Sequence, residues 1–175
     1  GCGACCRQPV PISISEARGI RQLVEALPEP RRSQVRARFD AARARLAASG
    51  LFEPFAHPTP ETAARKQELA MAYFRLGIPC PFLDDESCSI HPDRPVACRE
   101  YLVSSPAACC AQPTPETIRV VALSAKVSSV LRAMEQPASA DGAAWLALAL
   151  ALDRTDAPAE ESRLGPGPAW VEEFF

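Results

Sequence analysis

The sequence predicts an all-α fold: a single helical domain with irregular, cysteine-rich loops. Apolar residues recur at helical spacing in several segments, and proline or glycine stands where these segments begin or end. A chain of 175 residues is also long enough to bury a substantial core in one domain. We expect this domain to span residues 1–152. Residues 153–175, rich in proline, glycine and glutamate, are expected to form an extended tail that docks back onto it.

The first helix is expected after an extended segment that Pro9 and Pro11 impose on the backbone. Ser13 or Ser15 is suited to its N-cap, because a side-chain hydroxyl there accepts a hydrogen bond from an amide that has no partner within the helix. The expected apolar face consists of Ile20, Leu23, Val24 and Leu27.

A second helix is expected from about Pro30 to Ser49, with Gly50 as its C-terminal cap. The sequence Pro-Thr-Pro-Glu-Thr then occurs at residues 58–62, where threonine as N-cap and proline in the first turn mark a helix start. We expect this third helix to end at Gly77. The apolar positions of the second helix are Val35, Phe39, Ala42 and Leu46, and those of the third are Leu69, Met71, Tyr73, Phe74 and Leu76.

The same five residues recur at 113–117 and predict a fourth helix that ends before Pro137. Residues 78–91 suggest a loop or a short hairpin, residues 96–103 a short helix, and residues 143–152 a buried helix. The apolar face of the fourth helix would consist of Val120, Leu123, Val127, Val130 and Met134.

Charge and hydropathy exclude several classes of protein. The net charge of −2 provides no basic surface for nucleic acid or anionic membrane, and no apolar run reaches the 18 residues typical of a membrane-spanning helix. Nearly all cations are arginines and alanine is abundant, as in a GC-rich bacterial genome. We expect a cytoplasmic protein, and the missing initial methionine suggests further residues upstream.

The eight cysteines are the strongest indication of function. In a reducing compartment such cysteines indicate metal binding or redox chemistry, whereas in a secreted protein they would indicate four disulfides. Adjacent cysteines are poor candidates for bridging one another, and thiolates gathered from distant segments suit zinc or an iron–sulfur cluster. The cysteines are Cys2, Cys5, Cys6, Cys80, Cys88, Cys98, Cys109 and Cys110.

The spacing of the cysteines supports the metal interpretation. Cys2 and Cys5 have the spacing at which one tight turn brings two thiolates to the same metal, and Gly3 would ease that turn. Cys6 adds a third sulfur. Prolines at 79, 81, 92 and 95 stiffen the segments that carry Cys80, Cys88 and Cys98, which lowers the entropy lost on wrapping a metal.

These residues resemble the YkgJ-like cysteine-cluster proteins, described as carrying a zinc- or iron-chelating CxxCxxCC domain. The resemblance rests on four ordered blocks (residues 1–6, 80–83, 88–90 and 94–101) and on the cysteine that ends residues 102–110. It implies that Cys110 matches better than Cys109, and that the first cysteine of the motif would precede Gly1. The ligands it implies are Cys2, Cys5, Cys6, Cys80, Cys88, Cys98 and Cys110.

Several polar side chains near the cysteines have two interpretations. His91, which stands where the family commonly has tyrosine, is either a ligand or a packing residue, and His57 is expected to be a loop residue. Residues 84–86 are either oxygen ligands or a solvated turn. Arg94 and Arg99 either donate hydrogen bonds to thiolates or form surface ion pairs with acidic neighbours.

The sequence leaves the identity of the metal open between an iron–sulfur cluster and zinc. More thiolates are present than one zinc or one cubane needs, and adjacent cysteines favour iron–sulfur. No motif for nucleotide binding or hydrolysis is present. The alternatives are a protein-modifying enzyme resembling the flagellin lysine-N-methylases and a zinc-stabilised interaction module with a protein partner.

Overall fold

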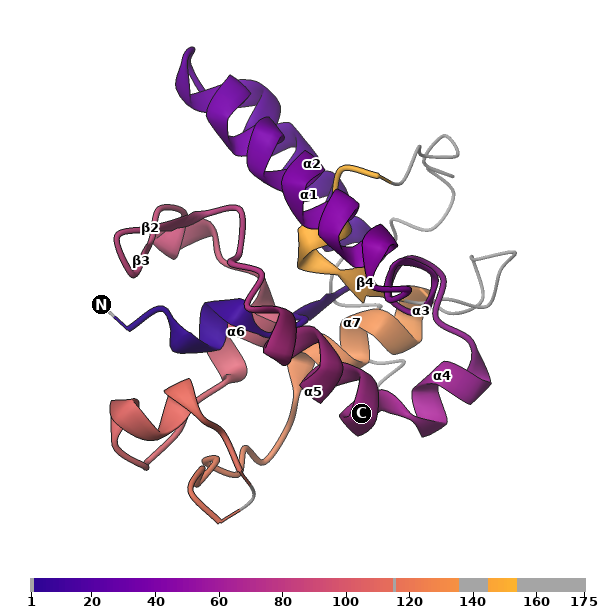
Figure 1. Ribbon diagram of the computed structural model, residues 1–175, viewed down its shortest axis with the longest axis vertical. Helices are drawn as coiled ribbons and strands as arrows, with labels where there is room; N and C mark the ends of the chain where they lie inside the picture. Colours follow the sequence, from indigo (N-terminus) through magenta and orange to yellow (C-terminus); the bar gives the residue numbers. More distant parts are fainter. Residues whose placement is uncertain (1, 115, 136–144, 154–175) are drawn as a thin grey trace, which may run out of the picture.

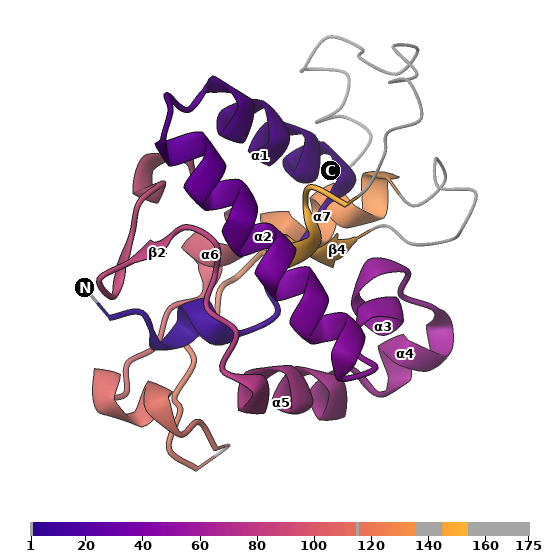
Figure 2. The same ribbon diagram turned by 45° about the horizontal axis from the view of Figure 1, so that its top comes forward.

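The computed structural model describes residues 2–114, 116–135 and 145–153. Most of the described chain is helical, as the predicted class requires, but two antiparallel pairs of two-residue strands, β1–β4 and β2–β3, are present as well. Figures 1 and 2 show the long helix α2 lying along α1. The α-helices are α1 (Ile14–Ala26), α2 (Arg31–Ala48), α3 (Phe52–Ala56), α4 (Pro60–Ala64), α5 (Lys66–Leu76), α6 (Val96–Glu100) and α7 (Val127–Glu135). The strands are β1 (Pro11–Ile12), β2 (Leu83–Asp84), β3 (Ser87–Cys88) and β4 (Leu146–Ala147), and short 3₁₀ helices are η1 (Ala4–Arg7), η2 (His91–Asp93), η3 (Ala107–Ala111) and η5 (Leu148–Leu150).

The first two helices form as predicted. Ser13 caps α1, because its side chain accepts a hydrogen bond from the amide of Glu16 while the Glu16 carboxylate accepts one from the amide of Ser13. At the end of α2, Gly50 has a φ of +73°, and the amide of Leu51 donates to the carbonyl of Leu46 at 3.0 Å. This left-handed position is one that glycine adopts without a steric penalty, so Gly50 terminates the helix.

The predicted third helix is divided in two. Thr59 caps α4 through a reciprocal pair of bonds with Thr62. Helix α4 ends at Ala64, and after Arg65 the chain continues in a new direction as α5. The amide of Arg65 bonds three residues back to the carbonyl of Thr62, which tightens the last turn of α4. Helix α4 buries no side chain, whereas α5 buries Leu69 and Tyr73 and ends at Gly77, at a φ of +61°.

The prediction of a fourth helix starting at residues 113–117 was wrong over its first half. Thr114 and Thr117 form only one capped turn, after which Val121 donates to the carbonyl of Leu102 at 2.9 Å. This pairing with residues 102–104 keeps residues 119–121 extended, and a helix begins only at α7. Val120 and Val127, placed on the buried face of the predicted helix, are 54% and 53% exposed. Pro115 and Pro137 lie outside the described residues.

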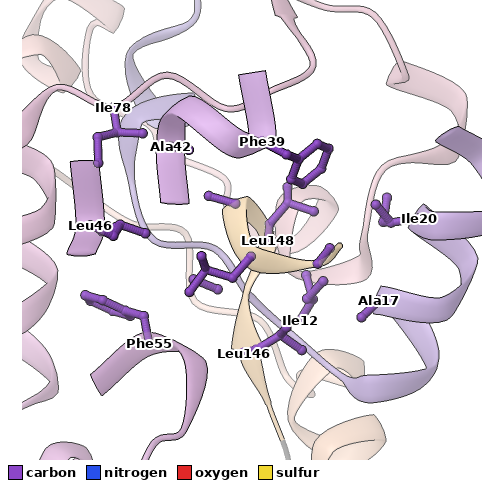
Figure 3. Close-up of a cluster of buried hydrophobic side chains, with 14 of the residues drawn as sticks. Ile12, Ala17, Ile20, Phe39, Ala42, Leu46, Phe55, Ile78, Leu146 and Leu148 are labelled. Carbon is purple, nitrogen blue, oxygen red and sulfur yellow. The ribbon is translucent and has the colours of Figure 1, made fainter. Parts of the chain in front are cut away.

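The buried helix predicted over residues 143–152 was also wrong in type, although not in burial. Residues 146–151 are buried, but they form β4 and η5. These residues are not an α-helix because they pair with another segment. Strand β4 is antiparallel to β1, and the amide of Leu148 donates to the carbonyl of Val10 at 2.8 Å. Figure 3 shows Leu146 and Leu148 at the centre of the core, with side chains of α1, α2 and α3 around them.

No helix among the described residues is both long and apolar enough to cross a membrane. The division of the chain at residue 152 and the docked tail remain predictions, since residues 154–175 lie outside the described part. The buried hydrophobic side chains of the described residues form one core, and Cys80, Cys88 and Cys98 pack against it.

Candidate metal centre

Segments that are distant in sequence bring six cysteines to the wall of one cavity of about 410 Å³. The N-terminal segment contributes three of them, the loop before the β2–β3 hairpin contributes one, and β3 and α6 contribute one each. The thiols do not form disulfides. The cysteines that line the cavity are Cys2, Cys5, Cys6, Cys80, Cys88 and Cys98.

Close packing against the β2–β3 hairpin fixes the N-terminal segment. The amide of Cys80 donates to the carbonyl of Cys6 at 2.7 Å, and the Arg7 guanidinium reaches both the carbonyl of Gly3 at 2.9 Å and the carboxylate of Glu86 at 2.6 Å. A Cβ atom on Gly3 would lie 2.5 Å from Oε2 of Glu86 and 2.8 Å from Cδ1 of Leu83. Gly3 has a φ of −90°, so the close approach of the hairpin, and not the turn, is what requires glycine here.

The hairpin itself is held by helix α2. Asp85 and Glu86 have positive φ angles, so the chain reverses in two residues. Arg31 and Arg38 of α2 both donate to the Asp84 carboxylate, with an Arg38 Nη1 to Asp84 Oδ1 distance of 2.7 Å. Although partial burial opposes it, these hydrogen bonds lower the pKa of Asp84 below its usual value. Of the three acidic residues of this turn, Asp84 and Glu86 are therefore engaged by arginines and anchor the hairpin.

The cavity thiols affect one another's ionisation. A hydrogen bond from the Cys6 thiol lowers the pKa of Cys5 to about 6, against the effect of burial, and the same bond raises the pKa of Cys6. Burial raises the pKa of Cys80 and of Cys98 to about 12, and the neighbouring thiols Cys88 and Cys5 contribute in the same direction. Without a cation, several thiolates in this space repel one another, and a bound metal ion would remove that cost.

The remaining wall of the cavity is mainly apolar, with buried Ile90 and Leu148 among its residues. His91 is exposed and lines the cavity; Arg94 also lines it, and its positive charge lowers the pKa of Cys5 and Cys98. Arg94 Nε donates to the carbonyl of His91 at 3.1 Å. Arg99 donates to the backbone carbonyl of Arg94 at 2.8 Å and also to that of Pro92, so it fastens this loop.

The last two cysteines lie apart from this cavity lining. Both belong to η3, which packs against η1. Cys110 is buried, and burial together with the nearby Cys2 and Cys5 raises its pKa, whereas Cys109 is half-buried. Of the two, Cys110 is thus close to thiols of the cavity. His57 lies far from this region in sequence, at the exposed C-terminal end of α3.

The chemistry of the donor set fits a thiophilic metal. Six cysteines line one space, and the one carboxylate among its described lining residues, that of Glu86, is engaged by Arg7. Among the described residues, however, no group of three or more His, Cys, Asp or Glu side chains is placed so that it could hold a metal ion as it stands. The thiols therefore share one cavity without forming a closed ligand shell.

Comparison with known proteins agrees with this arrangement. The model of the CxxCxxCC family, described as "Putative zinc- or iron-chelating domain", matches residues 1–122. The chain belongs to the CxxCxxCC family. No curated protein and no solved structure matches the chain. The family match covers all eight cysteines and ends before α7, so the last helix and β4 lie outside it.

Sequence reasoning did not identify the polar residues that position the cysteines of this CxxCxxCC domain. The Arg7–Glu86 pair and the bonds of Arg31 and Arg38 to Asp84 join segments that lie tens of residues apart. A single sequence contains no local signal for such pairs. The one local indication was Gly3 between two cysteines, and it was assigned to a turn.

Proposed function

We propose that this CxxCxxCC protein binds a metal centre in the cysteine cavity, and that the centre is an iron–sulfur cluster or zinc, with the cluster favoured. The proposed ligands are drawn from Cys2, Cys5, Cys6, Cys80, Cys88, Cys98 and Cys110. The observation that carries the proposal is that four segments of the chain bring six thiols to one cavity.

The size of the cavity supports a cluster. One zinc ion bound by four thiolates needs no more space than a single water molecule, which takes about 10–15 Å³ of cavity volume. The cavity of about 410 Å³ is many times larger and has more thiols than one zinc takes. Adjacent Cys5 and Cys6, both in η1, also suit a multi-iron centre better than a mononuclear knuckle.

The protein's own residues would bind and shield such a centre. An iron–sulfur cluster supplies one-electron redox chemistry, and hydrogen bonds, charge and solvent exposure set its potential. Here Arg94 offsets part of the thiolate charge, while Ile90 and Leu148 keep water from one side of the cavity. These residues would therefore influence the potential of the centre without being its ligands.

Anaerobic purification followed by metal and sulfide analysis and a visible absorption spectrum tests the proposal. We expect iron with acid-labile sulfide and broad visible absorption. Zinc without sulfide, inseparable from the folded state, would identify an interaction module with a structural metal instead. Absence of both metals would refute the proposed function.

A further inference from the structure

The carboxylates of Glu16, Glu100 and Glu135 each accept hydrogen bonds from the first turn of a different helix, and the three contacts close into a ring. Glu16 in α1 accepts from the amide of Val96, the first residue of α6, at 2.8 Å. Glu100, the last residue of α6, accepts from the amide of Ser128 in α7 at 3.2 Å and from its hydroxyl at 2.6 Å. The ring thus runs from α1 to α6 and on to α7.

The third contact returns the ring to α1. Glu135, the last residue of α7, accepts from the amide of Ile14 at 2.5 Å, from the amide of Ser15 at 3.0 Å and also from the Ser15 hydroxyl. Ile14 and Ser15 are the first two residues of α1. The first amides of a helix have no partner within it, and the helix dipole favours negative charge there, so each carboxylate stabilises the helix it caps.

Helix α6, which carries Cys98, depends on this ring more than the other two helices do. It has only five residues, and its N-cap residue, Pro95, provides no side-chain hydrogen bond. A helix of this length is not stable by itself, because too few backbone bonds offset the cost of its first turn. The ring holds α6 at both ends: Glu16 binds its first amide, and Glu100 at its last residue binds α7.

A positive charge on α7, that of Arg132, interacts with two carboxylates of the ring. The Arg132 guanidinium of α7 is half-buried, and burial lowers its pKa while the charges of Glu16 and Glu100 oppose that change. Its Nη2 donates to Ser129 at 3.1 Å. The positive charge of Arg132 is thus close enough to Glu16 and Glu100 to be influenced by both, and it offsets part of the repulsion between these two carboxylates.

We propose that Glu16, Glu100 and Glu135 are positioning residues for Cys98, and that the ring couples metal binding in the cysteine cavity to the order of α1 and α7. The inference rests on the proposed function, since it assigns the ring's role toward that metal centre. A ligand thiolate has to be held within a few tenths of an ångström of its bonding position, so an unanchored α6 would weaken the site. By reciprocity, metal binding would stabilise the caps of the distant helices.

The test compares zinc affinity and amide hydrogen exchange in the full chain and in Glu135→Ala. Glu135 is far from every cysteine in sequence, and its hydrogen bonds go to Ile14 and Ser15 at the start of α1. We expect exchange to accelerate in α6 around Cys98 as well as at Ile14 and Ser15, and zinc affinity to fall about tenfold. Glu135→Gln, which keeps one acceptor oxygen, should restore part of both. The matched control is Glu68→Ala, which removes an exposed carboxylate paired with Arg65 outside the ring.

Two results would overturn the inference. One is faster exchange at the start of α1 alone, with α6 exchange and zinc affinity unchanged, because Glu135 would then be only a local cap. The other is an equal loss of affinity in Glu68→Ala. If the parent chain binds no zinc, iron or cluster, the proposed function fails. The ring is still tested in that case, because amide exchange in α6 can be compared between the metal-free parent and the metal-free Glu135→Ala variant. If Glu135→Ala does not fold, Glu135→Gln and Ser15→Ala provide the same comparison.

Discussion

Replacing Gly3 with alanine should weaken metal binding, because the added methyl group has no room against the hairpin. Its Cβ would lie 2.5 Å from Oε2 of Glu86, 2.8 Å from Cδ1 of Leu83 and 3.2 Å from the backbone Cα of Glu86. The two side-chain atoms can move, but moving Glu86 breaks its pair with Arg7, and the backbone contact still requires a shift. Overpacking of this kind costs about 1–3 kcal/mol, and loss of an exposed ion pair adds up to about 1 kcal/mol.

This cost should fall mainly on the metal-bound state. In the metal-free Gly3→Ala variant the N-terminal segment can move away from the hairpin, whereas a bound metal has to keep Cys2, Cys5 and Cys6 near Cys80. At 1.4 kcal/mol per factor of ten, a total cost of about 1–4 kcal/mol lowers the affinity about fivefold to several hundredfold. Competition with a chelator of known affinity measures this directly.

Gly19→Ala is the matched control for this substitution. Gly19 lies inside α1, and a Cβ there would have nothing within 4 Å. Alanine is a better helix former than glycine by about 0.5–1 kcal/mol, so this variant should be slightly more stable and bind metal normally. Parent-like affinity in Gly3→Ala would refute the argument that close packing of the hairpin on the N-terminal segment holds the site together.

Three further predictions concern the metal, its ligands and the anchor of the hairpin. Removing the metal under reducing conditions should lower the melting temperature by about 10 °C or more, because a cross-link over so long a loop is worth about 4 kcal/mol; an unchanged calorimetric melting curve would contradict a structural role. Cys109→Ser should keep its metal content, whereas Cys80→Ser and Cys98→Ser should lose metal or be insoluble, as elemental analysis would show; normal stoichiometry in both would exclude the middle cysteines as ligands. Asp84→Asn should be about 1 kcal/mol less stable than the parent at pH 7. The pKa of Asp84 is lowered in the folded state from its usual 3.8, so its charge stabilises the folded protein above about pH 4 and this contribution is lost at lower pH. The stability difference between the variant and the parent, measured by denaturation, should therefore vanish as the pH falls. A difference that stays constant with pH would show that the charge is not responsible.

The sequence predicted those parts of the fold that are determined locally. Ser13 and Gly50 lie at the boundaries of α1 and α2, because a capping hydroxyl and a left-handed glycine act within a few residues. Residues 146–151 were correctly expected to be buried, but their strand and 3₁₀ structure results from pairing with Val10 and β1 across the whole chain. The extended conformation at Val120 likewise results from pairing with residues 102–104, which helical periodicity does not contain.

In the candidate site, too, the sequence predicted local features but not contacts between distant segments. The cysteine spacing indicated a metal and the family, and the structure places six of the cysteines on one cavity wall. The cysteine spacing did not indicate why Gly3 is required, or that Arg7 and Glu86 fasten the N-terminal segment. Nor did it indicate the ring of glutamates around α6, because a carboxylate that caps another helix looks like any surface charge in a single sequence.

Anomalous X-ray diffraction from crystals grown without oxygen, recorded at the iron and zinc edges, tests the central claim most directly. It locates a metal and identifies it in the same experiment. We predict a strong iron signal inside the cavity, bonded to thiolates of the N-terminal segment, Cys80, Cys88 and Cys98. A zinc signal at that place would confirm the metal site but contradict the cluster. A structure with no metal between these cysteines, and with disulfides joining them, would contradict the account as a whole.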